Sequence, residues 1–372
     1  MTAPSTGAPP ALRLERLVLR GFRNLADVDL APGPRFNVLS GDNGQGKSNL
    51  LEAIYYLGAL ESFRLAAKDA LIAHDAARAL LAAKLAGGVA PRTAKIWLDR
   101  AAPRRLALDD KRPRTRADWL AATPMVLFHP GDLALASGPP SGRRALLDHV
   151  AARLAPEYAR ALADYETALK SRNRLLRQEH ADRRSITSYD PLLAAHGAVL
   201  GLARAALVEE LEPATREAFA RIAGEELPLE VRYQPRVPPR EDALRTALAR
   251  SLDKDLARGF TAEGPHADDL ALTVRERRAR HHASQGQHRM IVLALKAAEL
   301  TVLARRLGLV PILLLDDVSS ELDPTRNARL MGLLDELGAQ VFVTTTQPEL
   351  IRVAHDRADY RVVAGRVEAQ AP

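Results

Sequence analysis

The chain has 372 residues, 47% of them hydrophobic, which is enough for two or three domains that each bury a core. The 53 Lys and Arg residues exceed the 46 Asp and Glu residues, and the net charge of +7 favours a polyanionic partner such as nucleic acid, although a solvated basic surface gives the same count. Because the sequence contains no cysteine, disulfides, zinc hooks and thiol chemistry are excluded.

Residues 1–11 (MTAPSTGAPPA) have neither an apolar core nor a positively charged flank, so we expect a disordered tail and no signal peptide. No stretch of the sequence approaches ~18 uninterrupted apolar residues, which argues against a membrane span. We therefore expect a soluble, cytoplasmic protein without a membrane partner.

The N-terminal part predicts strands followed by a helix. Leu12–Leu19 alternates apolar and charged residues with a period of two, as a half-buried strand does, and Val28–Leu30 predicts a second short strand. Phe36–Leu39 is an apolar run that stops at a glycine. From Ser48 to Leu60, apolar residues recur at helical spacing.

The C-terminal part repeats this alternation. The short apolar runs Ile312–Leu315 and Val341–Val343 are typical of parallel strands that are buried on both faces. Gly286–Leu307 and Asp323–Leu337 predict helices around these strands. Alternating strands and helices at both ends predict one α/β head assembled from the two ends of the chain.

The middle of the chain is different, because Ala, Leu, Arg and Glu recur at helical spacing from about residue 141 to 258. We predict a head of residues 12–134 and 261–372, with a helical arm of residues 135–260 inserted into it. The basic runs 170–184 and 275–280 either contact phosphates or form solvated faces.

The sequence GDNGQGKS at residues 41–48 fits the phosphate-loop pattern G-x-x-x-x-G-K-[ST] and lies between a predicted strand and a predicted helix. Such a loop turns its backbone N–H groups toward phosphates at the positive end of the helix. Lys47 would reach the β- and γ-phosphates of ATP, and the Ser48 hydroxyl would ligate Mg²⁺. The alternative is a glycine-rich turn without a ligand. The candidate ATP-binding residues here are Gly41, Asp42, Asn43, Gly44, Gln45, Gly46, Lys47, Ser48 and Asn49.

Two further segments suit nucleotide chemistry. Asp316 and Asp317 end a buried strand, where the first carboxylate could bind Mg²⁺ and the second could hold the attacking water, so both are candidate catalytic residues. A pair of solvent-facing loop acids is the alternative. The turn Ser284–Gln287 before a long helix offers a hydroxyl, backbone amides and a helix dipole to an anion, although small polar residues cap most helices.

The order of these segments resembles that of ABC-type ATPases. Ser284–Gln287 resembles their signature motif, Asp316-Asp317 their Walker B motif, and Ser320–Asp323 their D-loop. In that family the signature of one subunit closes over the γ-phosphate held by the other. The resemblance therefore implies an ATP-dependent homodimer in which Ser284, Gly286, Gln287 and Asp323 also contact nucleotide.

Further segments resemble the RecF family in particular and span the chain from about residue 12 to 350. They are Gly46–Ile54, Ser62–Arg64, Phe128–Leu133, Arg143–Asp148, Lys170–Asn173 and Gly264–Leu270. The resemblance implies sequence-independent DNA binding at gapped or duplex DNA, recombinational repair, slow ATP hydrolysis, and recombinase loading with a RecR-like mediator. Arg64 is either a phosphate contact or a surface arginine.

Some positions depart from the patterns of ABC ATPases. The expected catalytic acid is Asp317, as is usual in the RecF family, where most ABC ATPases have Glu, and Thr344–Thr346 stands where transporters carry a switch histidine. No glutamine loop is evident, and Phe128–Leu133 is expected in its place. The GPH segment has Ala267 where a basic residue is expected. A non-hydrolysing ATP-binding scaffold and, less well supported, a transporter cassette remain alternative functions.

Overall fold

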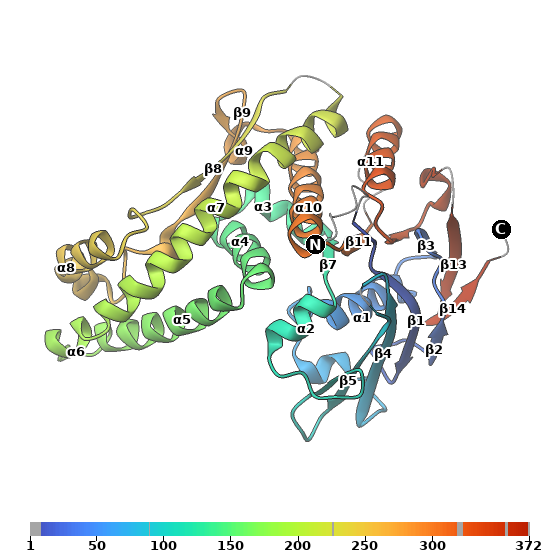
Figure 1. Cartoon of the computed structure of the whole chain (residues 1–372), viewed down its shortest axis with the longest axis horizontal. Coiled ribbons are helices and arrows are strands. Elements are labelled where there is room, and N and C mark those ends of the chain that lie inside the picture. Colours follow the sequence, from blue (N-terminus) through green and yellow to red (C-terminus); the bar gives the residue numbers. More distant parts are fainter. Residues whose placement is uncertain (1–8, 89, 225–226, 318–322, 354–355, 371–372) are drawn as a thin grey trace, which may run out of the picture. The chain divides into compact units, whose positions relative to one another are not determined.

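A computed structural model of the chain describes residues 9–88, 90–224, 227–317, 323–353 and 356–370 (Figure 1). The chain divides into two compact units. The unit that we call the head comprises Met1–Asp132, Ala218–Glu226 and Leu293–Pro372. The unit that we call the arm comprises Leu133–Glu217 and Leu227–Val292.

A sheet with a parallel centre forms the middle of the head. Its strand order is β14-β13-β3-β12-β11-β7, and all neighbours are parallel except the hairpin pair β13 and β14. The bounds are β3 (Phe36–Ser40), β7 (Met125–Phe128), β11 (Ile312–Asp316), β12 (Val341–Thr345), β13 (Arg357–Val363) and β14 (Arg366–Ala369). Nearly every residue of β3, β12, β11 and β7 is buried, as parallel strands covered on both faces require. The α/β head is thereby confirmed.

A second, antiparallel sheet has the order β2-β1-β4-β5-β6. Its strands are β1 (Arg13–Arg20), β2 (Val28–Leu30), β4 (Arg78–Ala86), β5 (Arg92–Asp99) and β6 (Arg105–Leu108). Buried and exposed residues alternate along β4 and β5, so one face of this sheet packs on the core. Helix α1 (Lys47–Ala59) contacts strands of both sheets and is buried nearly all round, which makes it the centre of the head's core.

The remaining elements of the head cover these sheets. They are η1 (Lys68–Leu71), α2 (Arg116–Ala122), η2 (Pro130–Leu133), α11 (Pro324–Glu336) and η5 (Pro348–Leu350). Helix α10 (Gln285–Leu307) begins in the arm and ends in the head. Of the predicted tail 1–11, residues 1–8 lie outside the described residues. Pro10 and Leu12 form backbone hydrogen bonds with Val310, of 2.8 and 2.9 Å.

The arm is mostly helical, as its periodicity indicates. It contains α3 (Ala134–Ser137), α4 (Pro140–Leu154), α5 (Pro156–Leu176), α6 (Arg183–Thr187), most of α7 (Asp190–Ala223), α8 (Glu241–Arg258) and α9 (Ala279–His282). It also holds a small sheet that the sequence did not indicate, formed by β8 (Leu229–Gln234), β9 (Asp269–Val274) and β10 (Arg277–Arg278), with η3 (Pro265–Ala267) before β9. Because β9 pairs with β8, residues 261–292 pack in the arm, although the division made from the sequence assigns them to the head.

Buried ion pairs hold the arm together. Arg172 is fully buried and its guanidinium donates to Asp190 at 2.9 Å and to Asp255 at 2.8 Å. Arg204 pairs with Asp148 at 2.7 Å. Breaking such a pair from one side would leave a buried charge uncompensated. Within the basic run 170–184, Arg172 is therefore a structural residue with no surface to offer to DNA.

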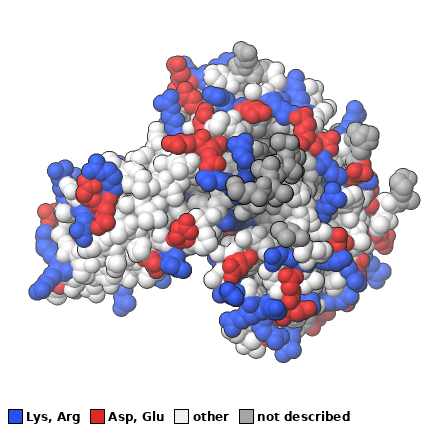
Figure 2. Space-filling model, in the orientation of Figure 1, with Lys and Arg blue, Asp and Glu red and all other residues white. Residues whose placement is uncertain are grey.

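One helical stretch, Arg183–Ala223, is long and apolar enough to cross a membrane by length and composition, and half of its apolar window is buried in the structure. Its central Arg204 lies in the buried ion pair with Asp148, as suits a core helix of the arm. Leu192, Val199 and Leu202 are exposed on α7, and Figure 2 shows a broad area without charged side chains over this part of the arm.

Candidate nucleotide-binding site

The phosphate loop connects β3 to α1, and its backbone can be formed only by glycine at two points. Gly41 has φ 146°, and a Cβ there would lie 2.3 Å from the carbonyl oxygen of Val362. Gly46 has φ 110° and directly precedes α1. Both angles lie in the region that glycine adopts without strain. The loop is thus shaped by close packing before any ligand is considered.

The turn of the β13–β14 hairpin is hydrogen-bonded to this loop. The Gln45 side chain accepts a hydrogen bond from the Ala364 N–H at 2.6 Å, and the Gln45 carbonyl accepts one from Gly365 at 2.9 Å. The Gln45 side chain therefore anchors the loop to the hairpin, leaving its backbone N–H as the group available to a phosphate. No local pattern indicates this contact, because the two residues are 319 positions apart in the chain.

Lys47 is the cation of the loop and is only 8% exposed. Its Nζ donates to the carbonyl oxygens of Gly41 at 2.6 Å and Asp42 at 2.9 Å. Burial lowers the pKa of Lys47, and the nearby carboxylates of Asp317 and Asp316 offset part of this effect. A buried ammonium with incomplete compensation attracts an anion such as a phosphate.

The acidic pair follows β11, which lies beside β12 in the sheet with Asp316 opposite Thr344. Asp316 is 7% exposed, and its Oδ1 accepts a 2.7 Å hydrogen bond from the Thr344 hydroxyl. The Asp317 N–H donates to the same hydroxyl oxygen at 2.9 Å, and Asp317 has φ 51°. Thr344 thus fixes the backbone and the carboxylate at the end of β11.

The loop and Asp317, the second residue of the acidic pair, line one cavity of about 210 Å³. The residues that line it are Asn43, Gly44, Gly46, Lys47, Ser48, Asn49, Arg64, Asp317 and Thr344. Strands β3, β12 and β11 are adjacent and parallel, so their carboxyl ends meet at this edge of the sheet. That is where open α/β sheets bind their ligands.

Arg64 reaches this cavity from the Ser62-Phe63-Arg64 segment. Its Nη1 donates to Asn49 Oδ1 at 2.7 Å, and its guanidinium lies 5.5 Å from the Phe63 ring centre. The segment is held by Ser62, whose hydroxyl donates to the fully buried Glu52 at 2.5 Å. The position of Arg64 agrees with a phosphate contact more than with an isolated surface arginine.

The segment expected in place of the glutamine loop follows β7, the neighbour of β11. The register places Phe128 of β7 opposite Leu315 of β11. His129, the residue after β7, is therefore level with Asp316, the last residue of β11. The Gly131 N–H donates to His129 Nδ1 at 3.1 Å, and burial lowers the pKa of His129, so the ring is neutral near pH 7. His129 was not among the residues singled out from the sequence, where it reads as one of ten histidines.

A buried lysine stands behind this segment. Burial alone would lower the pKa of Lys296, but the carboxylates of Asp132 and Glu299 raise it above its ordinary value. The Lys296 Nζ lies 3.2 Å from the Glu299 carboxylate and 4.0 Å from the Asp132 carboxylate. Asp132 also accepts the backbone N–H of His129 at 3.0 Å. Sequence patterns gave no signal for Lys296, which lies within an ordinary apolar helix.

The turn expected to act as the signature motif belongs to the arm and begins α10. The Ser284 N–H donates to Gln287 Oε1 at 2.8 Å, and the Gln287 N–H donates to Ser284 Oγ at 3.2 Å. This reciprocal pair is a capping box. Ser284 and Gln285 are exposed at the N-terminus of a 23-residue helix, with Gly286 beside them half-buried. The hydroxyl is therefore at the surface, at a helix end suited to an anion.

Of the expected D-loop, Ser320, Glu321 and Leu322 lie outside the described residues. Asp323 caps α11, accepting the N–H groups of Thr325 at 3.1 Å and Arg326 at 3.0 Å. Its carboxylate is therefore engaged in the helix cap.

The chemistry of the side chains at this site suits a magnesium ion. Ser48 offers a hydroxyl and Asp316 a carboxylate, and hard oxygen ligands of this type suit Mg²⁺ when nucleotide oxygens and water complete the shell. Asp316 has one oxygen held by Thr344, which would orient the other. Within the described ranges, no three His, Cys, Asp or Glu side chains gather in a way that could hold a metal ion by themselves.

The fold and the phosphate loop with its carboxylate-ended neighbouring strand define an ATPase head of the ABC and SMC type. Residues 13–101 match the family model described as RecF/RecN/SMC N terminal domain. The Smc head domain of Pyrococcus furiosus with an extended coiled coil has a TM-score of 0.59 at 18% identity, covering 96% of each chain, which bears on the fold alone.

Closer relatives identify the family. The DNA replication and repair protein RecF of Anaeromyxobacter sp. (strain Fw109-5) is 42% identical over 96% of this chain and 99% of its own, and that of Myxococcus xanthus is 38% identical over 97% and 98%. A solved structure of the recombination mediator protein RecF-ATP in the RecFOR pathway has a TM-score of 0.88 at 27% identity, covering 99% of this chain and 100% of that one. The chain belongs to the RecF family of DNA replication and repair proteins.

Proposed function

We propose that this protein is a slow ATPase that dimerises around ATP, binds gapped or duplex DNA in the dimeric state and releases it after hydrolysis. In this role it helps a RecR-like mediator to load recombinase during recombinational repair in the cytoplasm. The observation that carries the nucleotide chemistry is the shared cavity of Lys47, Ser48 and Asp317. Family membership supports the repair role and sets the transporter cassette aside.

In this proposal the phosphate loop binds the triphosphate of ATP through its backbone N–H groups. Lys47 exchanges its two carbonyl partners for phosphate oxygens, which compensate its buried charge better than neutral carbonyls do. Ser48 and Asp316 would hold Mg²⁺, which neutralises phosphate charge when bound. Arg64, released from Asn49, adds a second cation near the same phosphates.

Asp317 is the candidate general base for the attacking water. It follows Asp316 in the chain and lines the cavity, and its backbone is fixed by the hydrogen bond to Thr344. An Asp carboxylate is one methylene shorter than the Glu of most ABC ATPases, so it holds water less closely, and we expect slow hydrolysis. The positions of Thr344 and His129 beside the acidic pair provide no cationic switch, because a hydroxyl cannot become cationic and the His129 ring is neutral.

The second nucleotide contact would come from another copy of the chain. Ser284 and the N-terminus of α10 form an exposed anion-binding end, and the ABC-type resemblance assigns it to the γ-phosphate of a partner. ATP would then join two copies, and DNA would bind to the dimer through charge without sequence reading.

Sedimentation of the chain with and without ATP, repeated with a short duplex, tests this proposal. We expect a dimer only with ATP and a larger complex only with ATP and DNA. DNA affinity should fall steeply with salt, because each neutralised phosphate releases counterion. Equal DNA affinity with and without nucleotide would contradict the clamp.

A non-hydrolysing scaffold is the second candidate, and the short Asp317 side chain is the observation that favours it. A phosphate-release assay with and without DNA separates the two. Release that stops after one equivalent of bound ATP, or never begins, would favour the scaffold.

A further inference from the structure

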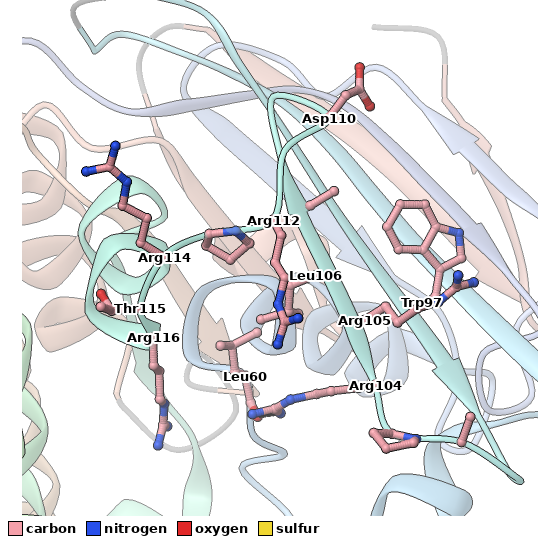
Figure 3. A pocket seen from close by; sticks show the side chains of 14 residues that line it. Leu60, Trp97, Arg104, Arg105, Leu106, Asp110, Arg112, Arg114, Thr115 and Arg116 are labelled. Carbon is pink, nitrogen blue, oxygen red and sulfur yellow. Dashed lines mark hydrogen bonds between the residues drawn. The ribbon is translucent and has the colours of Figure 1, made fainter.

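A second concave site in the head is lined by arginines and takes no part in the nucleotide chemistry described above. It lies along β6, the edge strand of the antiparallel sheet, and the loop from β6 to the start of α2. The cavity has a volume of about 940 Å³. We call it the arginine groove and define it by Arg104, Arg105, Arg112, Arg114 and Arg116 (Figure 3).

The charge in the arginine groove is strongly one-sided. Asp110 is the acidic residue that lines it, and its carboxylate is already paired with Lys95 at 2.6 Å. Apolar side chains, among them Leu60 and Leu106, lie between the arginines in Figure 3. The groove therefore combines a cationic rim with an apolar floor.

Two of the five arginines are held by the protein itself. Arg104 donates to the carbonyl of Leu60 and, at 3.2 Å, to the Tyr56 hydroxyl, which ties β6 to the end of α1. Arg116 donates to the Ala59 carbonyl at 3.3 Å and lies 3.6 Å from Glu61. These two build the wall of the groove.

The other three are available to a ligand. The Arg105 guanidinium lies 5.6 Å from the Trp97 ring centre, and its side chain has no hydrogen bond or ion pair with the described residues. Arg112 and Arg114 are exposed and make no hydrogen bond or ion pair with the part of the chain that the structure describes. Figure 3 shows Arg112 reaching down over the groove beside Leu106. Exposed arginines without acidic partners keep their full charge for a bound anion.

The groove is separated from the nucleotide by the length of α1. The phosphate loop precedes Lys47, the first residue of this helix, whereas Leu60, which lines the groove, follows its last residue. Thirteen helical residues at about 1.5 Å each place the two ends about 20 Å apart. A ligand in the groove would leave the ATP cavity untouched.

Protecting the edge strand explains only part of the arrangement. Charged residues on an edge strand prevent it from pairing with another sheet, and Arg105 on β6 meets that need. Arg112 and Arg114 lie on the loop beyond β6, where they do not protect the edge strand from pairing. Both residues nevertheless line the same cavity, which is better explained by a ligand than by protection of the strand.

We propose that the arginine groove binds the phosphodiester backbone of DNA. Guanidinium groups pair with phosphate oxygens in a bidentate fork, and several of them along a groove suit a chain of regularly spaced phosphates. The apolar floor can meet sugars and bases. This inference deepens the proposed function, on which it rests, by naming one surface through which the ATP-bound dimer would contact DNA.

The test compares the unaltered chain with Arg112→Ala/Arg114→Ala on fluorescent duplex, single-stranded and gapped oligonucleotides. We expect about a tenfold loss of DNA affinity and, at two lost phosphate contacts, a log–log salt slope shallower by about 1.8. The loss should appear in the presence of ATP, the state in which the proposed clamp binds DNA, whereas ATP affinity and phosphate release without DNA should not change. The oligonucleotide that loses most identifies the DNA form that the groove holds.

Two matched variants sharpen the comparison. Arg13→Ala/Arg361→Ala removes two exposed arginines from other strands of the head, which likewise lack ion-pair partners within the described ranges, and should leave DNA affinity within about twofold. Arg112→Lys/Arg114→Lys keeps the charge but loses the planar fork, so most of the salt slope should remain while affinity falls less than in the alanine variant. Unchanged melting temperatures would show that all three variants fold.

The outcomes separate this inference from the proposed function. If the unaltered chain binds DNA with ATP and Arg112→Ala/Arg114→Ala binds it equally well, the groove proposal is overturned and the clamp stands. Loss of binding to a labelled oligoglutamate peptide, with DNA affinity intact, would overturn it in favour of an acidic protein ligand. If the unaltered chain binds no DNA in either nucleotide state, both proposals fail.

Discussion

The Thr344 hydroxyl donates a 2.7 Å hydrogen bond to the carboxylate of Asp316, across two neighbouring parallel strands. The same oxygen accepts the backbone N–H of the following Asp317 at 2.9 Å. Thr344 is fully buried, so both bonds are shielded from water. One threonine on β12 therefore sets the orientation of both candidate catalytic acids.

Thr344→Val tests this positioning role. Valine has nearly the same shape but cannot form either hydrogen bond, so the Asp316 carboxylate and the Asp317 backbone lose a fixed orientation. We expect ATP hydrolysis to fall about 10-fold to 100-fold, in line with the loss of one or two buried hydrogen bonds at about 1.4 kcal/mol per tenfold change. Steady-state phosphate release over a Mg²⁺ titration measures it.

The control is Thr344→Ser, which keeps the hydroxyl and loses one methyl group. It should retain most of the hydrolysis and the Mg²⁺ dependence of the unaltered chain. If valine and serine variants were equally impaired, packing at this position and not the hydrogen bonds would explain the loss.

Lys47→Ala should abolish stable ATP binding. The variant keeps the backbone amides of the loop but loses its buried cation, and charge-assisted hydrogen bonds of this type contribute about 1.5–3 kcal/mol each. Titration calorimetry with ATP and Mg²⁺ measures the effect. Lys68→Ala, which removes a half-buried lysine on η1, serves as the matched control and should bind ATP normally. If Lys47→Ala bound ATP as tightly as the unaltered chain, residues 41–48 would not be the phosphate loop.

The strands around this site were predictable because their signals are local. Phe36–Leu39, Ile312–Leu315 and Val341–Val343 are continuous apolar runs, and they form β3, β11 and β12 with bounds that differ by one or two residues. The helix expected from Ser48 to Leu60 is α1 (Lys47–Ala59). A chain that buries a strand on both faces must make it apolar throughout, and this is readable without tertiary information.

Contacts that depend on pairing between distant segments could not be predicted. The hydrogen bond between Gln45 and Ala364, and the register that sets Thr344 opposite Asp316, follow from the assembled sheet. The Leu229–Gln234 strand was missed because it is short and lies among helical patterns, and its partner β9 is some 40 residues further along the chain. The arm extends to Val292 and not to residue 260, because β9 pairs with β8 of the arm.

Asp317→Asn should keep ATP and Mg²⁺ binding but slow hydrolysis about 100-fold or more, because the amide can position water yet accepts no proton. The backbone favours this substitution, since Asp317 has φ 51° and asparagine tolerates this conformation as well as aspartate does. The ATP-bound dimer should live longer. Single-turnover phosphate release and dimer lifetime measure the two effects, and unchanged turnover would return the role of base to Asp316.

The arm should lose stability in mild acid through His266. Its Nε2 lies 2.8 Å from the Thr261 carbonyl oxygen, and its Nδ1 lies 2.6 Å from the Tyr165 hydroxyl, so the neutral ring with a proton on Nε2 satisfies both partners. Burial lowers the pKa of His266 below its ordinary 6.5. The unfolded chain therefore binds more protons, and the stability contributed by the neutral ring is present above pH 6.5 and is lost as pH falls below it.

His266→Gln separates the two effects. The substitution should cost about 1–3 kcal/mol at pH 7.5, because buried hydrogen bonds are lost, but it should flatten the fall in stability between pH 6.5 and 5. Urea unfolding followed by arm-specific hydrogen exchange measures both. His129, whose pKa burial also lowers, provides a comparison in the head, so His129→Gln should leave the pH dependence of the arm unchanged. If the stability of His266→Gln fell as much between pH 6.5 and 5 as that of the unaltered chain, another titratable group would be responsible.

Ser284→Arg tests whether ATP joins two copies of the chain. The substitution removes the hydroxyl that caps α10 and adds a bulky cation at an exposed turn. If that turn acts on a nucleotide held by another copy, ATP affinity of the monomer should stay nearly unchanged, while ATP-dependent dimerisation, hydrolysis and DNA binding are lost together. Lys47→Ala, in contrast, loses nucleotide binding first. Ser284→Ala, which removes the same cap without adding bulk or charge, controls for helix stability, at about 1 kcal/mol.

Mixing Ser284→Arg with Lys47→Ala decides between one-copy and two-copy sites. In a mixed dimer, the unaltered loop of the first variant can meet the unaltered turn of the second, which restores one intact composite site, whereas the other site carries both substitutions. If loop and turn act within one copy, neither variant can supply an intact site and mixing restores nothing. We therefore expect ATP-dependent dimers and up to half of the hydrolysis per dimer to reappear on mixing, measured by sedimentation and phosphate release. A Ser284→Arg protein that dimerises normally by itself would show that the turn is an ordinary helix cap.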